Sequence, residues 1–374
     1  MKLKFKRDVL SKALSFVRNA IPRKEIEPIL NSLDLKAISD KSVQIISTDY
    51  DLMAVYVCDC EVLDFAEDSV KEMTIPAERL ISLVSKLAGD FIEMNLDGSN
   101  IFISCGSYKG EFKTAGTEGY PDIYNIASTD AIFSFKRETV LNGFRRIDFA
   151  VNSDEAKKNL MAIQVSKNGM VASNGSVTAV YREKFEVNTF CISSNCLSDL
   201  ISVMAASSEE DIKIFEEESY LVFKFGDNIF FTRKTSANFP DIFDKIDKPT
   251  EANNKEKIKF KIKDLKAVLQ RVSLTAPEET RSVQFEILTN DTLKISARDT
   301  KDFSSEETIS YVGDGLDISS EEPIILYFNY ALLLEILNKM AGEEIELKMN
   351  IKNIRTPIRV DEASWTVFLM RSAG

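Results

Sequence analysis

One order of local patterns occurs three times along these 374 residues, and this repeat constrains the fold more than any other feature. In each occurrence apolar residues recur at positions i, i+3, i+4 and i+7, the spacing of an amphipathic helix. An acidic turn and an alternating strand follow. The apolar positions are Leu80, Leu83, Val84 and Leu87; Leu197, Leu200, Ile201 and Met204; and Leu333, Ile336, Leu337 and Met340. The shared order predicts three copies of one structural unit.

A strand and a further helix are predicted at the start of each copy. The strands alternate apolar residues at Leu3 and Phe5, at Phe133 and Phe135, and at Ile258 and Phe260. The helical stripes that follow are Val9, Leu10, Ala13, Leu14 and Val17; Val140, Leu141, Phe144 and Ile147; and Leu265, Val268, Leu269 and Val272. Two helices and several strands per copy predict an α+β fold with antiparallel sheets.

A short motif closes each of the first two copies. Tyr120-Pro121-Asp122-Ile123-Tyr124 matches Phe239-Pro240-Asp241-Ile242-Phe243, and its Pro-Asp pair predicts a turn that leaves the last strand. The polar run from Lys248 to Lys255 is predicted to be a linker. We therefore expect three domains, at residues 1–128, 129–253 and 254–374.

The composition narrows the class of protein. The sequence contains no His, which removes the commonest general base and every Ser-His or Cys-His pair, and it has no phosphate-binding glycine loop. Its five Cys show no metal-ligand spacing, so reduced thiols, no metal and no cofactor are expected. Asp49 and Asp51 flank a strand turn, which favours a turn over a metal site. No signal peptide or membrane span is evident, so a cytoplasmic protein without membrane contact is predicted.

The basic residues of this acidic chain are concentrated in equivalent places. The net charge is −12, yet residues 1–24 hold eight basic side chains against Asp8 alone. The segments 136–146 and 255–272 are also basic, and all three contain the first strand and first helix of a copy. The predicted DNA-facing residues are Lys12, Lys24, Arg145, Arg146, Lys266 and Arg271. Three basic helix faces favour sequence-independent contact with the phosphates of a polyanion.

Over its whole length the chain resembles the bacterial DNA polymerase III beta subunit family, the sliding clamps. The resemblance rests on Pro28-Ile29-Leu30-Asn31-Ser32-Leu33, Ser47-Thr48-Asp49, Ile75-Pro76-Ala77, both Pro-Asp motifs, and Phe368-Leu369-Met370-Arg371. It implies three clamp domains per chain and a head-to-tail homodimer that closes a ring around duplex DNA. It further implies a non-catalytic processivity subunit. Its implied partners are the replicative DNA polymerase, a clamp loader ATPase complex, and other proteins that dock through short hydrophobic peptides.

The resemblance also implies two protein contacts. The dimer interface would hold Phe112, Ser273 and Leu274. The partner-peptide pocket would hold Leu160, Ser173, Gly175, Val177, Thr178, Pro240, Val367, Phe368, Leu369, Met370 and Arg371. The family's Thr-Asp-Gly-His-Arg-Leu run is Ser173-Asn174-Gly175-Ser176-Val177-Thr178 here, and its Met-Pro-Met-Arg run ends as Phe368-Leu369-Met370-Arg371, followed by three further residues. We expect an apolar pocket with altered rim polarity.

Two other classes of function compete with the clamp. An enzyme using carboxylates or Lys would need a polar cluster within one copy, and the sequence shows none. A peptide-binding adaptor without DNA leaves the three basic first helices unexplained. The oligomeric state with and without circular DNA discriminates among the three.

Overall fold

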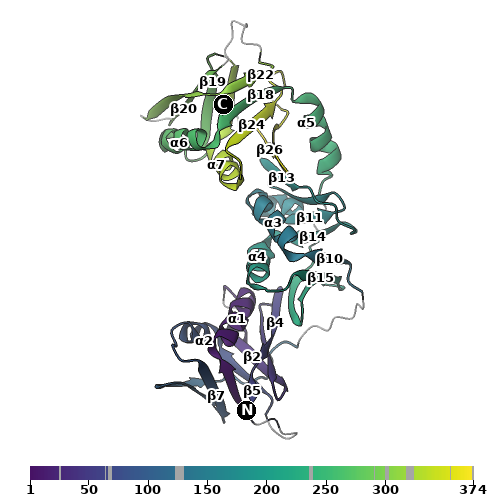
Figure 1. Ribbon diagram of the computed structural model, residues 1–374, viewed down its shortest axis with the longest axis vertical. Helices are drawn as coiled ribbons and strands as arrows, with labels where there is room; N and C mark the ends of the chain where they lie inside the picture. Colours follow the sequence, from purple (N-terminus) through teal and green to yellow (C-terminus); the bar gives the residue numbers. More distant parts are fainter. Residues whose placement is uncertain are drawn as a thin grey trace. The chain divides into compact units, whose positions relative to one another are not determined.

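The computed structural model describes residues 1–24, 27–63, 65, 70–122, 130–235, 239–289, 291–299, 303–316, 324–353 and 355–372. Figure 1 shows helices and strands distributed along the described part of the chain. All the strand pairs within this described part are antiparallel, which confirms the predicted α+β class. No helix among these residues is long and apolar enough to cross a membrane.

The order of elements repeats three times, as the sequence patterns predict. The first set is β1 (Lys2–Lys6), α1 (Arg7–Val17), β2 (Ser32–Ser39), β3 (Ser42–Thr48), β4 (Leu52–Asp59), β5 (Glu61–Val62), β6 (Glu72–Pro76), α2 (Ala77–Val84), β7 (Phe91–Asp97), β8 (Asn100–Cys105) and β9 (Tyr108–Lys113). The second set is β10 (Phe133–Lys136), α3 (Arg137–Ile147), β11 (Ala162–Ser166), β12 (Gly169–Ser173), β13 (Val177–Tyr181), β14 (Phe190–Ser193), α4 (Leu197–Ala206), β15 (Asp211–Glu216), β16 (Tyr220–Phe225) and β17 (Asn228–Arg233). The third set is β18 (Glu256–Lys261), α6 (Ile262–Val272), β19 (Ser282–Ile287), β20 (Thr292–Arg298), β21 (Ser304–Ser310), β22 (Val312–Asp314), β23 (Ile324–Asn329), α7 (Tyr330–Lys339), β24 (Glu344–Met349), β25 (Ile358–Glu362) and β26 (Trp365–Leu369).

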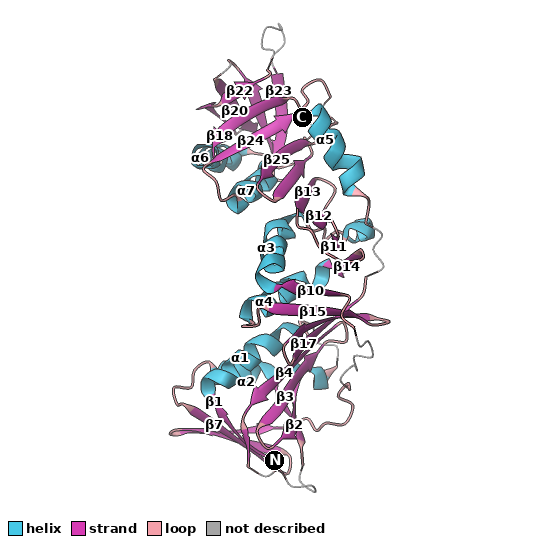
Figure 2. Cartoon of the chain, turned by 45° about the vertical axis from the view of Figure 1, so that its right-hand side comes forward, coloured by secondary structure: helices cyan, strands magenta, loops and turns pink. Residues whose placement is uncertain are grey.

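The described strands form four sheets, and two of these sheets combine strands from different copies. Sheet A has the order β5-β1-β7-β8-β9, and sheet D has the order β21-β20-β19-β23. Sheet B, β10-β15-β16-β17-β4-β3-β2-β6, joins the first and second copies where β17 pairs with β4. Sheet C, β14-β11-β12-β13-β26-β25-β24-β18-β22, joins the second and third copies where β13 pairs with β26. Figure 2 shows the strands of these sheets with the helices beside them.

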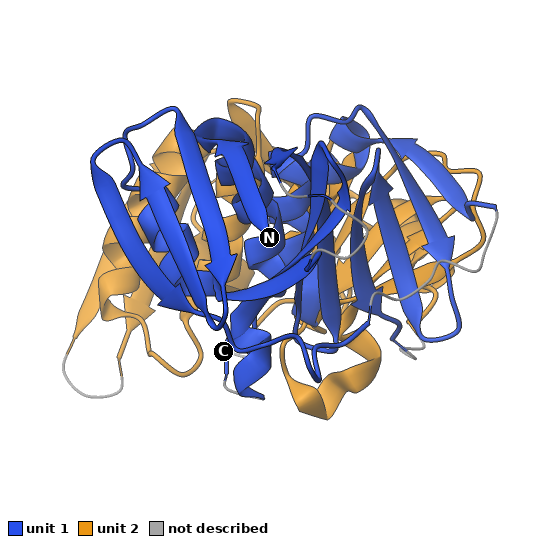
Figure 3. Ribbon diagram, turned by 90° about the horizontal axis from the view of Figure 1, so that it is seen from below, with its two compact units in different colours: residues 1–142, 195–235 blue, residues 143–194, 236–374 orange. Residues whose placement is uncertain are grey.

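The chain forms two compact units (Figure 3). Unit 1 comprises residues 1–142 and 195–235, and unit 2 comprises residues 143–194 and 236–374, so the second copy contributes to both. The predicted three-domain boundaries therefore remain a prediction. The boundary after residue 128, the motif residues Ile123 and Tyr124, and the last two residues, Ala373 and Gly374, lie outside the described residues.

The helices bury the apolar stripes that the sequence predicts. In α1 the buried residues include Leu10, Ala13 and Leu14, and α6 buries Leu265, Val268, Leu269 and Val272. A stripe of this width gives each helix one face to pack against a sheet and leaves its other face for solvent. The basic residues of these helices therefore lie on the remaining face.

The segment 248–255 was predicted to be a linker without regular structure, but most of it is helical. A π-helix at Phe243–Asp247 continues directly into α5 (Lys248–Asn253). Asp241 accepts a hydrogen bond from the backbone of Asp244, 3.1 Å away, so this Pro-Asp motif starts a helix and does not turn the chain out of a strand. Thr250 is buried, and Asn254 donates to the backbone oxygens of Lys348 and Pro357. These tertiary contacts make the polar segment helical.

Candidate partner cleft and basic helix faces

The predicted partner pocket lies within unit 2, where β13 meets β26. The two strands are antiparallel, and Val177 lies opposite Leu369 while Thr178 lies opposite Phe368. Side chains alternate between the two faces of a strand, so directly opposed residues share a face. This register divides the predicted pocket residues into two groups.

One group shares a single face of sheet C, and we call this face the candidate cleft because the partner peptide is predicted to bind there. It contains Thr178, Phe368 and Met370, and Ser173 lies beside Thr178 with their hydroxyl oxygens 2.7 Å apart. Leu160 packs against the cluster around Phe368. Met370 is 38% exposed at the edge of this face. The cleft therefore combines an apolar floor with a hydroxyl pair and an exposed thioether.

The other group faces the opposite side of sheet C. Val177, Val367 and Leu369 are each at most 1% exposed and do not belong to the cluster around Phe368. The prediction that Val177 and Val367 form pocket walls is therefore wrong. A one-residue step along a strand moves a side chain to the other face.

The remaining predicted residues lie at the ends of the cleft. Gly175 has a φ of +88°, and a β-carbon there would lie 4.0 Å from Leu160 Cδ1, so the turn passes close beside the cleft. Pro240 is half-buried and directly follows Phe239, a member of the cluster. Arg371 is half-buried and donates to the backbone oxygen of Asn350 at 2.7 Å. Burial lowers the pKa of Arg371.

Sequence reasoning missed the residues that form the floor of this cleft. They are Val171, Val180, Phe239 and Ile242, with Cys191, Phe243 and Ile246 packed beside them. The repeated aromatic-Pro-Asp-Ile-aromatic motif was a usable signal. Its two apolar residues at positions i and i+3 place Phe239 and Ile242 on one side of the segment that starts the π-helix.

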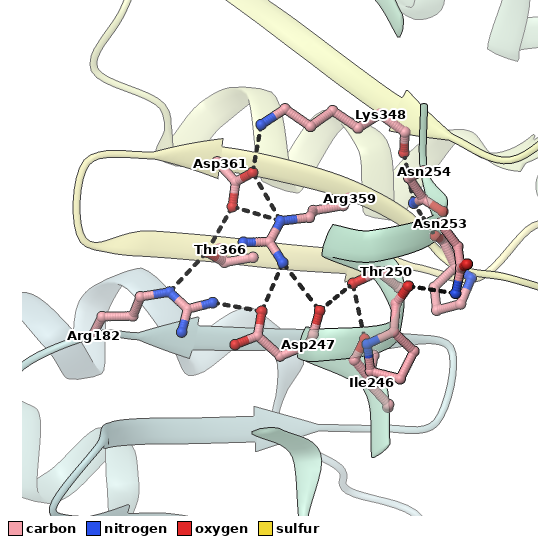
Figure 4. Close-up of polar contacts among 12 residues, drawn as sticks. Arg182, Ile246, Asp247, Thr250, Asn253, Asn254, Lys348, Arg359, Asp361 and Thr366 are labelled. Carbon is pink, nitrogen blue, oxygen red and sulfur yellow. Dashed lines mark hydrogen bonds and ion pairs between the residues drawn. The ribbon is translucent and has the colours of Figure 1, made fainter. Parts of the chain in front are cut away.

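An ion-pair network attaches the 239–254 segment to sheet C (Figure 4). Asp247 accepts hydrogen bonds from Arg182 and Arg359, each at 2.7 Å. Arg359 also binds Asp361, which accepts from Lys348 and Thr366. Burial alone would raise the pKa of Asp361, but these hydrogen bonds lower it below its usual value. The Arg359 guanidinium is thus paired with the carboxylates of both Asp247 and Asp361.

The predicted DNA-facing residues differ in their availability. Lys12, Lys24 and Arg145 are exposed, and Lys266 is half-buried. Arg271 is exposed but forms a two-pronged contact with Glu307, with nitrogen–oxygen distances of 2.6 and 3.0 Å. Four of the six cations therefore remain as simple candidates for phosphate contact.

Arg146 is bound within unit 2, contrary to the prediction that it faces DNA, and so is Lys339. Arg146 lies 2.7 Å from Glu362, also donates to the backbone of Lys339, and stacks 5.4 Å from the ring of Trp365. Lys339 donates to the Arg145 backbone oxygen and to Asp148 at 2.6 and 2.7 Å. These pairs offset the positive charge of both side chains.

The residues predicted for a dimer interface lie on strand edges or beside them. Phe112 is half-buried on β9, at the end of sheet A. Leu274 is 84% exposed in the turn Ser273–Thr275, and Ser273 is half-buried. Thr275 of the same turn lies 2.6 Å from Ser305 of β21, the end strand of sheet D.

The thiols and carboxylates have structural explanations. The five Cys are present as thiols, and burial raises the pKa of Cys196 to about 12. Asp49 accepts backbone hydrogen bonds from Asp51 and Leu52 at 3.0 and 2.7 Å, which confirms a turn at this position. Among the described residues no group of three or more His, Cys, Asp or Glu is placed to hold a metal ion.

Comparisons with known proteins agree with this architecture. Residues 1–124 match the model for the DNA polymerase III beta subunit, N-terminal domain, and residues 249–364 match the model for its C-terminal domain. A beta sliding clamp of Synechococcus elongatus is 24% identical and covers 94% of this chain and 93% of its own length. One of Chlamydia muridarum is 23% identical, with 99% and 98% covered.

Solved structures have the same fold. The DNA polymerase III beta subunit of Thermotoga maritima superposes with a TM-score of 0.85 at 21% identity, covering 99% of this chain and 98% of that one. A sliding clamp from Bartonella birtlesii, bound to griselimycin, superposes with a TM-score of 0.87 at 20% identity over both whole chains. The two family models, these relatives and the repeated element order lead to one conclusion: the chain belongs to the DNA polymerase III beta subunit family.

Proposed function

We propose that this chain is a DNA sliding clamp, in which two copies close a ring around duplex DNA and tether the replicative DNA polymerase. The observation that carries the proposal is the pattern of strand pairing. The last strand of the second copy, β17, pairs with β4 of the first, and the last strand of the third copy, β26, pairs with β13 of the second. The corresponding strands β9 and β21 each end a sheet.

The pairings of β17 with β4 and of β26 with β13 have the same register. The same register can be applied to the edge strands β9 and β21 of two subunits. Thr232 lies opposite Leu52 in one pairing, and Leu369 lies opposite Val177 in the other. Matching the hairpins of the copies places Phe112 at the position of Thr232 and Leu369, and Phe303 at the position of Leu52 and Val177. A head-to-tail contact then sets Phe112 opposite Phe303 of the partner subunit.

The exposure and charge of the two edges support this contact. Phe303 is 66% exposed, an unusual state for a large aromatic side chain. The same register sets Lys109 opposite Glu306 of the partner subunit, whose side chain is 70% exposed. Opposite charges across antiparallel strands stabilise the pair, and like charges destabilise it.

Leu274 also has an internal counterpart at one of the paired junctions. The turn after α3 carries Phe149 at the equivalent position, and its ring lies 6.2 Å from that of Trp365 on β26. Tyr108 occupies the position of Trp365 on β9. Leu274 is therefore expected to contact Tyr108 of the partner subunit, which explains its 84% exposure in the isolated chain.

A charge exchange tests the register. Lys109→Glu and Glu306→Lys should each give folded monomers in sedimentation, because both interfaces of either homodimer then carry like charges. An equimolar mixture should form dimers, since each interface regains one Lys and one Glu. Lys113→Glu, on the same strand, should not recover Glu306→Lys into mixed dimers, because Lys109 would still face the new lysine at position 306. Mixtures that remain monomeric exclude this register.

Loss of the apolar contacts tests the interface itself. Phe112→Ala and Leu274→Ala remove its proposed anchors, and such anchors typically contribute more than about 1 kcal/mol each. Both variants should be folded by circular dichroism and shifted toward monomer. Unchanged dimer affinity in both variants would remove Phe112 and Leu274 from the interface.

DNA contact is proposed to be electrostatic and independent of sequence. Lys12, Lys24, Arg145 and Lys266 are the accessible cations, and phosphate neutralisation makes binding weaken as salt rises. Replacing these residues with Ala should reduce the salt dependence, while Arg146→Ala should affect it little. Clamps loaded on nicked circles should remain until the circle is cut. Equal release from circles and linear duplex would contradict encirclement.

The cleft around Met370 is proposed to receive short hydrophobic peptides of the polymerase, the clamp loader ATPase complex and other partners. A peptide with two or three large apolar residues after a Gln should bind it in the micromolar range. Met370→Ala with Leu160→Ala should weaken binding at least tenfold, about 1.4 kcal/mol. Equal affinity for both proteins, measured by calorimetry, would place the docking site elsewhere. A cytoplasmic location remains part of this proposal.

A further inference from the structure

The outer face of each paired sheet junction is covered by a segment that connects two copies. In unit 1 the cluster of Ile46, Met53, Val55, Phe215, Val222 and Phe231 is packed by Tyr120 and Ala131, which lie between β9 and β10. In unit 2 the cluster around Phe368 is packed by Phe239 and Ile242, which lie between β17 and β18. Both covering segments contain an aromatic-Pro-Asp sequence.

Sheet A has a third face of the same kind. Strands β7, β8 and β9 correspond to β15, β16 and β17 of unit 1, and Phe102 occupies the position of Val222. Whereas Val222 is fully buried beneath its cluster, Phe102 is 43% exposed.

This face is hollowed and apolar at its centre. A hollow of about 350 Å³ is lined by Phe102, Leu63, Asn95, Ser104, Lys2 and Lys109. Leu63 is 58% exposed at its border. All these residues belong to unit 1, and among them only Lys109 lies on the strand that is proposed to meet the partner subunit.

Lysines lie on the β1 side of the hollow, whereas Glu111 lies directly opposite Phe102 on β9. The alternation of β1 places Lys2, Lys4 and Lys6 on the same face as Phe102, since Lys2 pairs with Asn95 and Asn95 pairs with Phe102. Lys4 lies 5.1 Å above the ring of Phe91, and 3.6 Å from Glu61. Glu93 also faces the hollow, but the three β1 lysines make its β1 side positive.

The covered face in unit 2 indicates which chemistry suits such a surface. There Arg359 occupies the position of Phe102, stacks 5.7 Å from Phe368, and binds Asp247 of the covering segment (Figure 4). Phe239 and Ile242 of the same segment fill the apolar cluster. The covering segment thus places Phe239 in the apolar cluster and the Asp247 carboxylate on the Arg359 guanidinium.

From this equivalence we infer that the outer face of sheet A is a docking site for a short acidic segment of another protein, with an aromatic residue followed by Pro-Asp. Its aromatic side chain packs on Phe102 and Leu63, and its carboxylates contact Lys2 and Lys4. The site lies outside the cleft around Met370 and extends the proposed function with a second place for a partner.

The chain's own covering sequence supplies a probe. A fluorescein-labelled peptide Phe-Pro-Asp-Ile-Phe-Asp, the sequence of residues 239–244, is titrated into the full-length protein at low salt and followed by fluorescence anisotropy. We expect saturable binding that Phe102→Ser weakens at least fivefold. Lys2→Glu with Lys4→Glu should weaken it further, as should the peptide in which both Asp are replaced by Asn.

Two controls separate this site from other apolar surfaces. Leu288 is exposed to the same extent as Phe102, 43%, and Leu288→Ser should leave the affinity unchanged. Met370→Ala should also leave it unchanged. Absence of saturable binding overturns the inference. It is equally overturned if Phe102→Ser binds as tightly as the unaltered protein, or if Met370→Ala alone abolishes binding.

Discussion

The junction between β4 and β17 in unit 1 and the junction between β13 and β26 in unit 2 have one architecture but different surfaces. Unit 1 places Met53 where unit 2 has Thr178, and its Leu30 is fully buried where Leu160 of unit 2 is half-buried. Tyr120 covers the first junction and Phe239 the second. A few side chains therefore decide whether the outer face of a junction is closed or remains a cleft.

The covering segments are also attached by different chemistry. In unit 2 Asp247 binds Arg359, with 10% and 9% of the two side chains exposed, whereas unit 1 has the apolar Val222 at the position of Arg359. Buried ion pairs lose much of their Coulomb attraction to the cost of desolvation, so they contribute direction more than net stability. The comparison suggests that unit 2 uses charge to fix the position of its segment beside the cleft.

The largest expected effect comes from breaking this ion pair. Asp247→Ala removes one of the two carboxylates that pair with the buried Arg359 guanidinium and leaves only Asp361, so it should lower the free energy of unfolding by about 3 kcal/mol. Adding Arg359→Val, which brings in the residue of unit 1, should recover most of that loss. Urea unfolding of the single and double variants measures both. If the double variant is as unstable as the two single losses combined, the two units do not offer interchangeable solutions.

A buried carboxyl group in unit 1 gives its junction a pH dependence near neutral pH. Asp34 is 3% exposed, and burial, together with the nearby Glu72 carboxylate, raises its pKa to about 7. Gln164 occupies the equivalent position in unit 2. Because the folded pKa is raised, the contribution of Asp34 to stability is complete below the unfolded value near 3.8 and is lost as the pH rises through about 7.

The effect of Asp34→Asn on the free energy of unfolding should therefore change sign across the pH range. Relative to the unaltered chain the variant should gain on the order of 2 kcal/mol in the free energy of unfolding between pH 4 and pH 8. Urea unfolding at both pH values provides the measurement, and Gln164→Asn is the matched control without a titrating group. A difference that stays constant with pH would show that Asp34 ionises normally.

Filling the cleft should give the junction between β13 and β26 the closed surface of the junction between β4 and β17. Thr178→Met introduces the unit 1 residue, whose longer side chain occupies the space beside Phe368 and removes the hydroxyl partner of Ser173. We expect at least tenfold weaker binding of the hydrophobic partner peptide, about 1.4 kcal/mol, with an unchanged dimer. Calorimetry measures the affinity. Met53→Thr, the reciprocal change in unit 1, should leave peptide affinity as it is.

The smallest expected effect concerns the hydroxyl of Tyr120. It donates toward the backbone oxygens of Ser32 and Ile46, each 3.2 Å away, and Phe239 has no such group. Tyr120→Phe should reduce the free energy of unfolding by about 1 kcal/mol, the usual worth of one hydrogen bond. Phe239→Tyr buries a hydroxyl and is the reciprocal test. If Tyr120→Phe is as stable as the unaltered chain, packing alone holds Tyr120 over the junction between β4 and β17.

The sequence was sufficient to predict the helices and strands whose apolar residues recur with a regular period. Helical stripes such as that of Leu265, Val268 and Leu269 require one buried face, and three such sets in one order predict the repeated architecture. The helix α5 was missed because its residues form no apolar stripe, and its position depends on contacts with residues about a hundred positions away. Local patterns carry no information about such partners.

The cleft was predicted only in part for a related reason. Family likeness identified the strands that contribute to it, but not the phase of β13 and β26, so residues of both faces were included. The pairing of Arg146 with Glu362 joins positions 216 residues apart and cannot be seen in a helical projection. Only the fold decides which cation on a basic helix is already neutralised.

The charges on β9 and β21 also bear on how newly made chains avoid aggregation. Lys109 and Lys113 lie on one edge, and Glu306 and Glu307 lie on the other. Exposed strand edges are templates for unwanted pairing, and charged side chains on them oppose it. Two copies of β9 facing each other would bring lysines together, and two copies of β21 would bring glutamates together. The charge pattern that we propose to favour head-to-tail assembly would therefore also oppose pairing between identical edges of single chains.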